Sequence, residues 1–525
     1  MSESGGVDHS KEEALGYRRA PNPPQGWCVV EIGEVGEVVT GNTPPTAEKD
    51  NFGDAYPLVR PTELGKDKPI VDATIGLSKQ GALRARLLPT GSVLVSCIGA
   101  LGKVGIAGCE LATNQQINSV VFDPELVDAR YGFYYCQTIR KWLEDHSSAT
   151  TISIINKSKF QKAPFSLAPR RAQASIVAEI EKQFTRLDAA TTALKRVQAN
   201  LKRYRASVLK AACEGRLVPT EAELARKEDR AYEPADKLLQ RILRERRARW
   251  EADTLAKMQA SGRPPKDDHW KQKYKEPTAP DTSNLPPLPD GWCWASVEQI
   301  SSKVVDGVHQ KPNYVNTGIP FITVKNLTAG PGISFERTNF ITPEDHAEFI
   351  RRADPERGDI LVSKDGTLGT IRAIRTDQEF SIFVSVAMIK PVVLEISNFL
   401  EIALTSPQVQ IQMVPKGSGL QHIHLEDLRE DCIPLAPLRE QDRVVAECSR
   451  LLTLMDATAE LVKRNIQRVL ATRSSILRSA FAGRLVPQDP TDEPASALLE
   501  RIRIRRASSV VSRSNRTRRA EHANA

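Results

Sequence analysis

The sequence predicts an α+β protein in which two similar mixed α/β domains are separated and held by two long helices that pair as an antiparallel coiled coil. Residues 167–219 recur without a gap at residues 435–487, and 22 of the 53 aligned positions are identical. Both copies carry apolar residues at the spacing of a helix. The stretches that precede the two copies match only in places. The chain is therefore expected to consist of two similar halves related by a pseudo-twofold internal repeat.

Length and composition indicate a folded protein of several domains. With 525 residues the chain can bury large cores, and its net charge of +8 permits a polyanionic partner without requiring one. The eight cysteines are scattered and include no Cys-x-x-Cys pair, which argues against a zinc ribbon and against a disulfide framework. The leader at residues 1–25 is polar, and no run of about 18 apolar residues occurs. We expect a soluble, cytoplasmic protein with no membrane partner.

The two variable domains are expected at residues 26–166 and 288–434. Each contains Gly-Trp-Cys near its start, after a proline-rich segment, and each contains a Gly-x-Leu-Gly turn. Short β-branched runs between Gly, Pro and Asn predict strands, among them residues 93–95, 319–324 and 360–362. One helix is expected in each domain, near residues 128–145 and 396–409. The strand order cannot be read from these patterns.

Each copy of the repeated block predicts one long helix, at residues 167–219 and 435–487. Pro169 and Pro437 suit helix starts, whereas Gly215 and Gly483 suit helix ends. Some 43 helical residues span about 65 Å. An ordinary core helix is the alternative, but the length and the scarcity of breakers favour two helices that bury apolar stripes against each other. The expected stripe is formed by Ile176, Ile180, Phe184, Leu187, Leu194, Val197, Leu201, Tyr204 and Val208 in the first helix and by Val444, Val445, Leu451, Leu452, Met455, Leu461, Val462, Ile466, Val469, Ile476 and Leu477 in the second.

A charged connector at residues 220–287 and a tail at residues 488–525 follow the two blocks. Both contain Glu-Pro-Ala-x-x-Leu-Leu, which opens a further helix. In the connector this helix is expected to run to Met258 and to break at Gly262. In the tail it gives way to a stretch without acidic residues that contains Arg501, Arg503, Arg505, Arg506, Arg513, Arg516, Arg518 and Arg519. We interpret the tail as a solvated segment, and a nonspecific arm that contacts phosphates is the alternative.

The sequence contains no convincing catalytic constellation. The glycines of residues 99–104 are too closely spaced for a phosphate-binding loop, and no Ser or Thr follows the lysine. Asn22-Pro23-Pro24 is similar to the Asn-Pro-Pro-aromatic element of amino-group DNA methyltransferases, but Gln25 replaces the aromatic residue, which favours a proline-rich linker. His422 and His424 lie on one face of an expected strand without a third ligand nearby, so a polar surface is favoured over a metal site. The sequence indicates a binding protein.

The order of variable domain, long helix, variable domain and long helix resembles the specificity subunit of type I restriction–modification enzymes. Three motifs carry the resemblance; each is weak alone, but their doubled order is specific. They are the Pro-Leu-x-x-Gln helix start at Pro437, the Gly-Arg-Leu-Val-Pro helix ends at residues 215–219 and 483–487, and the Gly-Trp domain starts at Gly26 and Gly291. The resemblance covers residues 26–487. The first helix departs from the pattern, because its start reads Pro169-Arg170-Arg171-Ala172-Gln173.

This resemblance implies that the variable domains are target recognition domains, each of which reads one half of a bipartite double-stranded DNA site. It implies that the helices fix the gap between the halves, and that the chain docks two methyltransferase subunits. S-adenosylmethionine, ATP and Mg²⁺ are expected in partner subunits and no cofactor or metal in this chain, which would be non-catalytic. Whether ATP-dependent restriction subunits also join is left open. The repeat agrees with these roles, because base-reading domains must differ whereas a spacer must stay constant.

Candidate DNA-contacting residues are polar side chains in turn-like segments of the two domains. Base edges are read mainly by Arg, Lys, Asn and Gln side chains. In the first domain the candidates are Asn42, Lys103, Asn114, Gln115, Gln116, Asn156, Lys157 and Lys159. In the second they are His309, Gln310, Lys311, Lys325, Asn326, Lys364, Lys416, Gln421 and His422. An ordinary solvated loop residue is the alternative for each of them.

Two other functions remain open at this point. A coiled-coil scaffold with protein-binding globular domains would show the same repeat, but its binding would not weaken steeply with salt, as binding through phosphate contacts does. A methyltransferase in its own right is disfavoured, because no glycine-rich cofactor loop accompanies the altered Asn-Pro-Pro motif.

Overall fold

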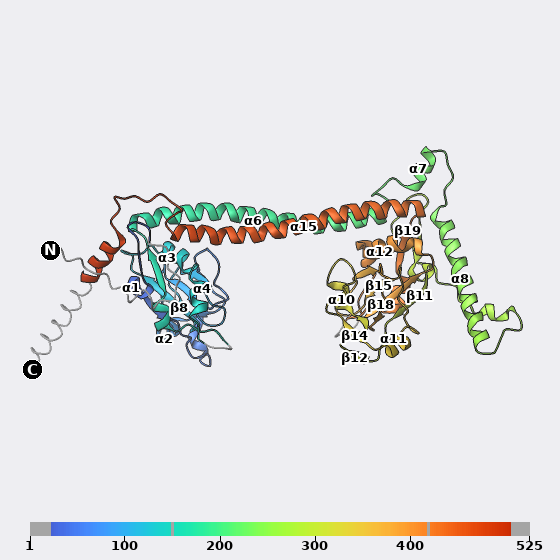
Figure 1. Cartoon of the computed structure of the whole chain (residues 1–525), viewed down its shortest axis with the longest axis horizontal. Coiled ribbons are helices and arrows are strands. Elements are labelled where there is room, and N and C mark those ends of the chain that lie inside the picture. The colour runs from blue at the N-terminus through green and yellow to red at the C-terminus, as the bar shows by residue number, and fades with distance from the viewer. Residues whose placement is uncertain (1–22, 149–151, 417–420, 506–525) are drawn as a thin grey trace, which may run out of the picture. The chain divides into compact units, whose positions relative to one another are not determined.

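The computed structural model describes residues 23–148, 152–416 and 421–505 (Figure 1). The chain forms two compact units. The first comprises the chain up to Leu194 together with the chain from Arg464 onward, and the second comprises Lys195–Lys463. Most of the polar leader lies outside the described residues, as do five of the tail arginines, namely Arg506, Arg513, Arg516, Arg518 and Arg519. No helix in the described ranges is long and apolar enough to cross a membrane.

The first domain is built on a four-stranded antiparallel sheet in the order β2-β8-β5-β6. Its strands are β2 (Gly36–Thr40), β8 (Ile117–Phe122), β5 (Val93–Ser96) and β6 (Val104–Ile106). A smaller sheet contains β4 (Gly76–Leu77), β3 (Phe52–Val59) and β7 (Ala112–Thr113), of which β3 and β7 run parallel. The chain enters through β1 (Cys28–Glu31) and leaves through β9 (Pro164–Leu167). These two strands pair antiparallel, so the domain starts and ends at the same place.

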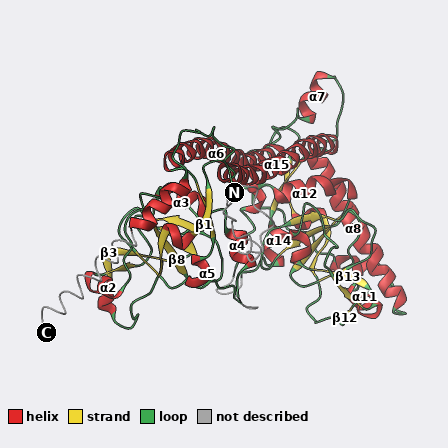
Figure 2. Ribbon diagram, turned by 60° about the vertical axis from the view of Figure 1, so that its left-hand side comes forward, coloured by secondary structure: helices red, strands yellow, loops and turns green. Residues whose placement is uncertain are grey.

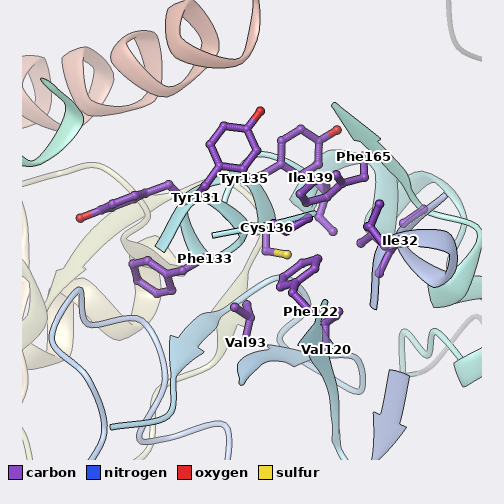
Figure 3. Packing of buried hydrophobic residues seen from close by; sticks show 14 of the residues in the cluster. Ile32, Val93, Val120, Phe122, Tyr131, Phe133, Tyr135, Cys136, Ile139 and Phe165 are labelled. Atoms are coloured by element: carbon purple, nitrogen blue, oxygen red, sulfur yellow. The ribbon is translucent and has the colours of Figure 1, made fainter. Parts of the chain in front are cut away.

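Aromatic side chains dominate the core of the first domain (Figure 3). Asp128 starts α3 by accepting hydrogen bonds from the backbone N–H groups of Arg130 and Tyr131. Phe165 of β9 lies 4.5 Å from the Tyr135 ring of α3, measured between ring centroids. Burying each such side chain stabilises the fold by about 1.5–3 kcal/mol. The helices of this domain are α1 (Ile32–Val35), η3 (Lys49–Asn51), α2 (Lys79–Arg84), α3 (Ala129–Cys136), α4 (Arg140–Asp145) and α5 (Lys157–Gln161).

The second domain repeats this plan with a larger second sheet. Its main sheet has the order β11-β18-β15-β16, its other sheet has the order β12-β14-β13-β17, and β10 pairs with β19. The strands are β10 (Cys293–Ser296), β11 (Ser301–Asp306), β12 (Tyr314–Val315), β13 (Ile319–Ile322), β14 (Asn339–Ile341), β15 (Ile360–Ser363), β16 (Ile371–Ala373), β17 (Ser381–Ile382), β18 (Val386–Pro391) and β19 (Cys432–Leu435). The helices are α9 (Val297–Ile300), α10 (Val324–Thr328), α11 (Pro343–Phe349), η5 (Leu394–Ile396), α12 (Ser397–Thr405), α13 (Pro407–Gln410) and α14 (Leu425–Glu430).

Each helix that the sequence predicts inside a domain is in fact two short helices. In the first domain α3 and α4 are separated because the Tyr135 carbonyl accepts from both the backbone N–H and the hydroxyl of Thr138, which closes a tight turn. In the second domain Pro407 follows α12, and Ser406 restarts the chain as the N-cap of α13. The predicted strand at residues 319–324 likewise ends at Ile322, because Thr323 and Asn326 form a capping box that begins α10.

The turn after β5 matches the turn after β15 atom for atom in its hydrogen bonds. The Ser96 hydroxyl donates to the Ala100 carbonyl at 2.6 Å and accepts from the Lys103 backbone N–H at 2.9 Å. Ser363 makes the same two contacts with Thr367 and Thr370, at 2.5 and 2.8 Å. The internal repeat therefore extends into the variable domains, where the backbone is retained and the side chains have changed.

The two long helices are α6 (Arg170–Cys213) and α15 (Leu438–Phe481), each of 44 residues. They lie side by side and run in opposite directions (Figures 1 and 2), which confirms the predicted pairing. In the first unit the Arg473 guanidinium lies 3.9 Å from the centroid of the Phe184 ring and pairs with Asp188 at 2.5 Å. In the second unit Arg205 of α6 forms an ion pair with Asp456 of α15.

The apolar stripe of the helix pair is buried mainly near the helix ends. Ile176 and Ile180 join the core of the first domain, and Val208 and Val444 join the core of the second. Further along, Val197, Tyr204 and Leu461 are exposed by 40%, 51% and 51%. The predicted stripe is therefore shared between helix pairing and packing of each helix end on a domain.

A helix packs on each domain start in the same way. In the second unit α8 (Ala235–Ala260) follows α7 (Glu221–Lys227), and the Ala235 backbone N–H donates to the Gly291 carbonyl at 2.7 Å. In the first unit residues 495–505 are helical, and Ala495 donates to Gly26 at 2.8 Å. Beyond α8 lies η4 (Asp268–Lys273). Of the described tail arginines, Arg503 and Arg505 pair with carboxylates of the first domain, and Arg501 pairs with Glu493 at 2.6 Å.

Candidate nucleic-acid interface

Loops from distant parts of the first domain meet at one end of its main sheet. Gly41, after β2, donates to the Ile117 carbonyl at 3.1 Å, and Cys97, after β5, donates to the Gln116 carbonyl at 2.8 Å. Gly99 donates to Ser153 at 2.9 Å, and Ile155 donates to Cys97 at 2.8 Å. These bonds join residues 41–43, 97–103, 114–116 and 152–156, which we name the first loop surface. Connecting loops held by a rigid sheet are a common place for binding residues.

The second domain has an equivalent loop surface at the same end of its main sheet. Gly307, after β11, donates to the Val386 carbonyl at 3.1 Å, and Lys364, after β15, donates to the Ser385 carbonyl at 2.9 Å. Ile423 donates to the Lys364 carbonyl at 3.0 Å, and His422 and Lys416 exchange backbone hydrogen bonds at 2.9 Å. We name residues 307–311, 364–370, 383–385, 416 and 421–422 the second loop surface.

The two surfaces differ most in charge. The end of β2 carries Thr40, whose hydroxyl donates to Asn118 Oδ1 at 2.7 Å, and a bridge joins Ile98 to Ile154. The end of β11 instead carries Asp306, which accepts from Lys364 Nζ at 2.9 Å. The apolar bridge is replaced by one between Asp365 and His422, with His422 Nδ1 2.5 Å from Asp365 Oδ1. One backbone plan thus carries uncharged side chains at these positions in the first half and ion pairs in the second.

Comparison with known proteins identifies this arrangement. A family model described as the type I restriction modification DNA specificity domain matches residues 24–202. The specificity subunit of the type I restriction enzyme EcoBI of Escherichia coli is 22% identical over 501 residues, which span 92% of this chain and 93% of that protein. The chain is similar over nearly its whole length to type I restriction–modification specificity subunits. This confirms the resemblance that the sequence motifs indicate.

The similarity of this specificity subunit to its relatives extends over both halves. The EcoKI specificity subunit of Escherichia coli strain K12 is 20% identical over 518 residues, covering 93% of this chain and 97% of that protein. A similar chain occurs in a solved structure concerned with complex assembly and conformational transition of the type I restriction–modification system. The two chains match with a TM-score of 0.62 and 16% sequence identity, and the match covers 89% of this chain and 100% of the other. The protein is the DNA sequence-specificity component of such a system, which decides against the scaffold alternative.

In the first half of the specificity subunit, some candidate DNA-contacting residues are exposed, whereas others make hydrogen bonds that hold the loops together. Lys103 and Gln115 are exposed on the first loop surface, whereas Asn114 is buried and donates to Gln116 Oε1 at 2.9 Å. Asn42 donates to the Arg84 carbonyl at 2.8 Å and accepts from the Arg86 backbone N–H, which anchors the loop after β2. The remaining candidates, Asn156, Lys157 and Lys159, lie at or near the start of α5, where Asn156 is the N-cap and the Lys159 ammonium donates to the His146 carbonyl.

In the second half, most candidate DNA-contacting residues are exposed and a few are partly or fully buried. His309, Gln310, Lys311, Lys416 and Gln421 are exposed on the second loop surface, and Lys325 is exposed on α10. Lys364 and His422 are half-buried and bonded to Asp306 and Asp365. Asn326 is buried, where it accepts from the Thr323 backbone N–H and donates to the Ser334 carbonyl at 2.9 Å, so it supports the loop.

No pattern in the sequence indicates Asp306, whose carboxylate holds several side chains at the second loop surface. Asp306 is only 3% exposed, yet Lys364, Arg352 and His309 all contact its carboxylate. Burial opposes the ionisation of Asp306, but the hydrogen bonds and charges of Lys364 and Arg352 outweigh it and keep its pKa below the usual value. Arg352 is 46 residues away in sequence, so no local pattern connects it to Asp306.

Asp431, which follows α14, makes the stability of the second unit depend on pH. Burial, aided by the charges of Asp427 and Glu430, raises its pKa to about 7, and its Oδ2 atom has no hydrogen-bond partner in the described part of the chain. An unfolded Asp has a pKa of about 3.9. Between these values the folded state retains a proton that the unfolded state has released, so the contribution of protonated Asp431 to stability is fully present below about pH 4 and is lost as pH rises through about 7.

Asp431→Asn is therefore expected to stabilise the second unit at about pH 8, by at most roughly 4 kcal/mol. The gain should be much smaller at about pH 5, where less of the penalty has developed. Thermal unfolding of wild type and variant at the two pH values measures the difference. Equal gains at both values would show that ionisation of Asp431 is not the cause.

Proposed function

We propose that the specificity subunit recognises a bipartite double-stranded DNA site. One half would be read by the target recognition domain at residues 26–166, and the other half by the domain at residues 288–434. The observation that carries the proposal is the pair of loop surfaces, which share one backbone plan but present different side chains. Two readers on equivalent scaffolds need different side chains if they recognise different bases, because sequence is read through hydrogen bonds to base edges.

The exposed side chains of the two surfaces are the proposed DNA contacts. In the first they include Lys103 and Gln115, and in the second His309, Lys311 and Lys416. Lysines at such positions suit phosphates, which fix the register of the protein on DNA, whereas Gln and His suit base edges. The buried Asn114 and Asn326 support these loops and are not expected to touch DNA.

The long helices are proposed to set the unread gap between the two halves. Both have 44 residues, although the domains that they connect have diverged. A spacer must keep one length, and an antiparallel pair of helices resists bending more than a single helix does. The gap would therefore be a property of α6 and α15 and independent of the bases that the domains read.

The chain is proposed to dock two methyltransferase subunits, one on each copy of the repeat. The repeated block presents two equivalent helical surfaces, and exposed apolar side chains such as Leu454 and Leu470 lie on α15. S-adenosylmethionine would bind in the methyltransferase, with ATP and Mg²⁺ in restriction subunits where these are present. The specificity subunit would determine the DNA site at which its partner subunits act.

Genome-wide methylation mapping tests this function directly. A host expressing the chain together with its neighbouring methyltransferase is compared with the same host expressing the methyltransferase alone. We expect a new methylated motif with two specified halves and an unspecified gap, present only when the specificity subunit is expressed. A motif without a gap, or no new motif although the methyltransferase is folded and expressed, would contradict the proposal.

A further inference from the structure

The second loop surface holds one arginine by a single edge. The Arg352 side chain donates from Nε to the carbonyl oxygens of Asp306 and Gly307, at 3.1 and 3.3 Å, and from Nη2 to the Asp306 carboxylate. No acceptor for its Nη1 group occurs among the described residues, and the side chain is 48% exposed. A guanidinium has five N–H donors in a rigid plane. Fixing one edge therefore aims the remaining donors away from the sheet, toward solvent.

The cluster of Asp306, Lys364 and Arg352 has a net positive charge. Asp306 contributes one negative charge, whereas Lys364 and Arg352 each contribute one positive charge. The Lys364 side chain is only 14% exposed and its Nζ lies 2.9 Å from Asp306 Oδ2, so its charge is largely compensated by Asp306. Arg352 is thereby left as an outward-facing cation whose direction is fixed by a buried carboxylate. His309 Nε2, at 3.2 Å from Asp306 Oδ2 and 3.5 Å from Arg352 Nη2, completes the arrangement.

The first domain also has an arginine at the matching position, because Arg86 Nη1 donates to the Thr40 carbonyl at 2.7 Å, but among the described residues no carboxylate pairs with it. Thr40 stands where Asp306 stands in the second domain, and it donates to Asn118. Cys97 follows β5 where Lys364 follows β15, and burial raises the pKa of its thiol to about 12, so it carries no charge at neutral pH. The ionic cluster is thus a property of one recognition domain and not of the shared scaffold.

We propose that Asp306 is a positioning residue that fixes Arg352 for hydrogen bonding to the major-groove edge of a guanine in the half-site of the second domain. Guanine presents two adjacent acceptors there, N7 and O6, and an arginine fork is their most common protein partner. The assignment rests on the proposed function, because it requires that this surface meets DNA. It adds the identity of one base class and the side chain that selects it.

Base-analogue competition tests the assignment in the assembled complex of specificity subunit and methyltransferase. Each guanine of the mapped motif is replaced in turn by 7-deazaguanine, which lacks the N7 acceptor. We expect one guanine, in one half of the motif, at which this change weakens wild-type binding about tenfold. Arg352→Ala should weaken binding to the unmodified site by a similar factor and show no further loss with the analogue at that guanine. Asp306→Asn should likewise reduce the loss of binding that 7-deazaguanine causes at that guanine.

Matched variants separate positioning from general loss of structure. Asp377→Asn makes the same chemical change at an exposed carboxylate of the same domain, where Asp377 pairs with Arg357 at 2.6 Å, and should leave the response to the analogue unchanged. Arg352→Lys keeps the charge but lacks the fork, and should behave like Arg352→Ala even if Asp306→Asn does not fold.

Two outcomes would overturn the assignment while the proposed function stands. One is a bipartite motif in which neither half contains a guanine whose N7 matters. The other is a sensitive guanine at which Arg352→Ala retains the full wild-type response. Failure of the proposed function is distinct, because the wild-type complex would then yield no bipartite motif.

Discussion

Adding one helical turn to both long helices is expected to lengthen the gap of the recognised motif and to leave both half-sites unchanged. Four residues inserted after Lys195 in α6 and four after Lys463 in α15 would extend the pair by about 6 Å. DNA rises about 3.4 Å per base pair, so the preferred gap should grow by roughly two base pairs. Both positions lie at the boundaries between the compact units, away from the domain cores. Methylation mapping of the variant reads the gap and the half-sites together.

Insertions of the same size elsewhere serve as controls. Four residues placed after Gly262, in the turn beyond α8, should leave the gap unchanged, because this turn has open space around it and lies outside the helix pair. An insertion in α6 alone should shift Arg205 away from Asp456, or Phe184 away from Arg473, and lower stability without producing a new gap. A paired insertion that altered the half-sites while the gap stayed fixed would show that the helices are not the spacer.

Gly307→Ala is expected to abolish recognition of one half-site. A Cβ atom at Gly307 would overlap the carbonyl oxygen of Ile382, because the backbone after β11 passes directly against the turn between β17 and β18. Relief requires the strands to separate, which should cost several kcal/mol in the second unit. Thermal unfolding should show a destabilised second unit, and mapping should show loss of sequence-specific methylation or a motif with only one specified half.

Gly330→Ala is the matched control in the same domain. Nothing lies within 4 Å of a Cβ atom at Gly330, so the same substitution should change stability by less than about 1 kcal/mol and leave the motif intact. If Gly307→Ala unfolded at the wild-type temperature and retained both half-sites, close backbone packing at the base of the second loop surface would be excluded as a requirement for recognition.

The repeat, the long helices and the alternation of variable and constant segments could all be predicted from the sequence. They depend on local information: apolar spacing fixes a helix, Pro169 and Gly215 bound it, and a repeat is visible without any knowledge of contacts. The candidate residues at turns such as Lys103 and His309 could also be named, because polar side chains between strands are surface-exposed in most folds. These features identify the family and the kind of function.

Only the tertiary structure decided which of these residues act together. Strand pairing places Asp306 beside Lys364 and Arg352, which lie far from it in sequence, and this depends on the register of β11, β18 and β15. The same pairing buries Asn114 and Asn326, which no local pattern separates from their exposed neighbours. Hydrophobic periodicity is a property of neighbouring residues, whereas a recognition surface is made by contacts between segments that the chain brings together only when it folds. The sequence therefore determined the architecture, and the fold determined the surface that we propose reads DNA.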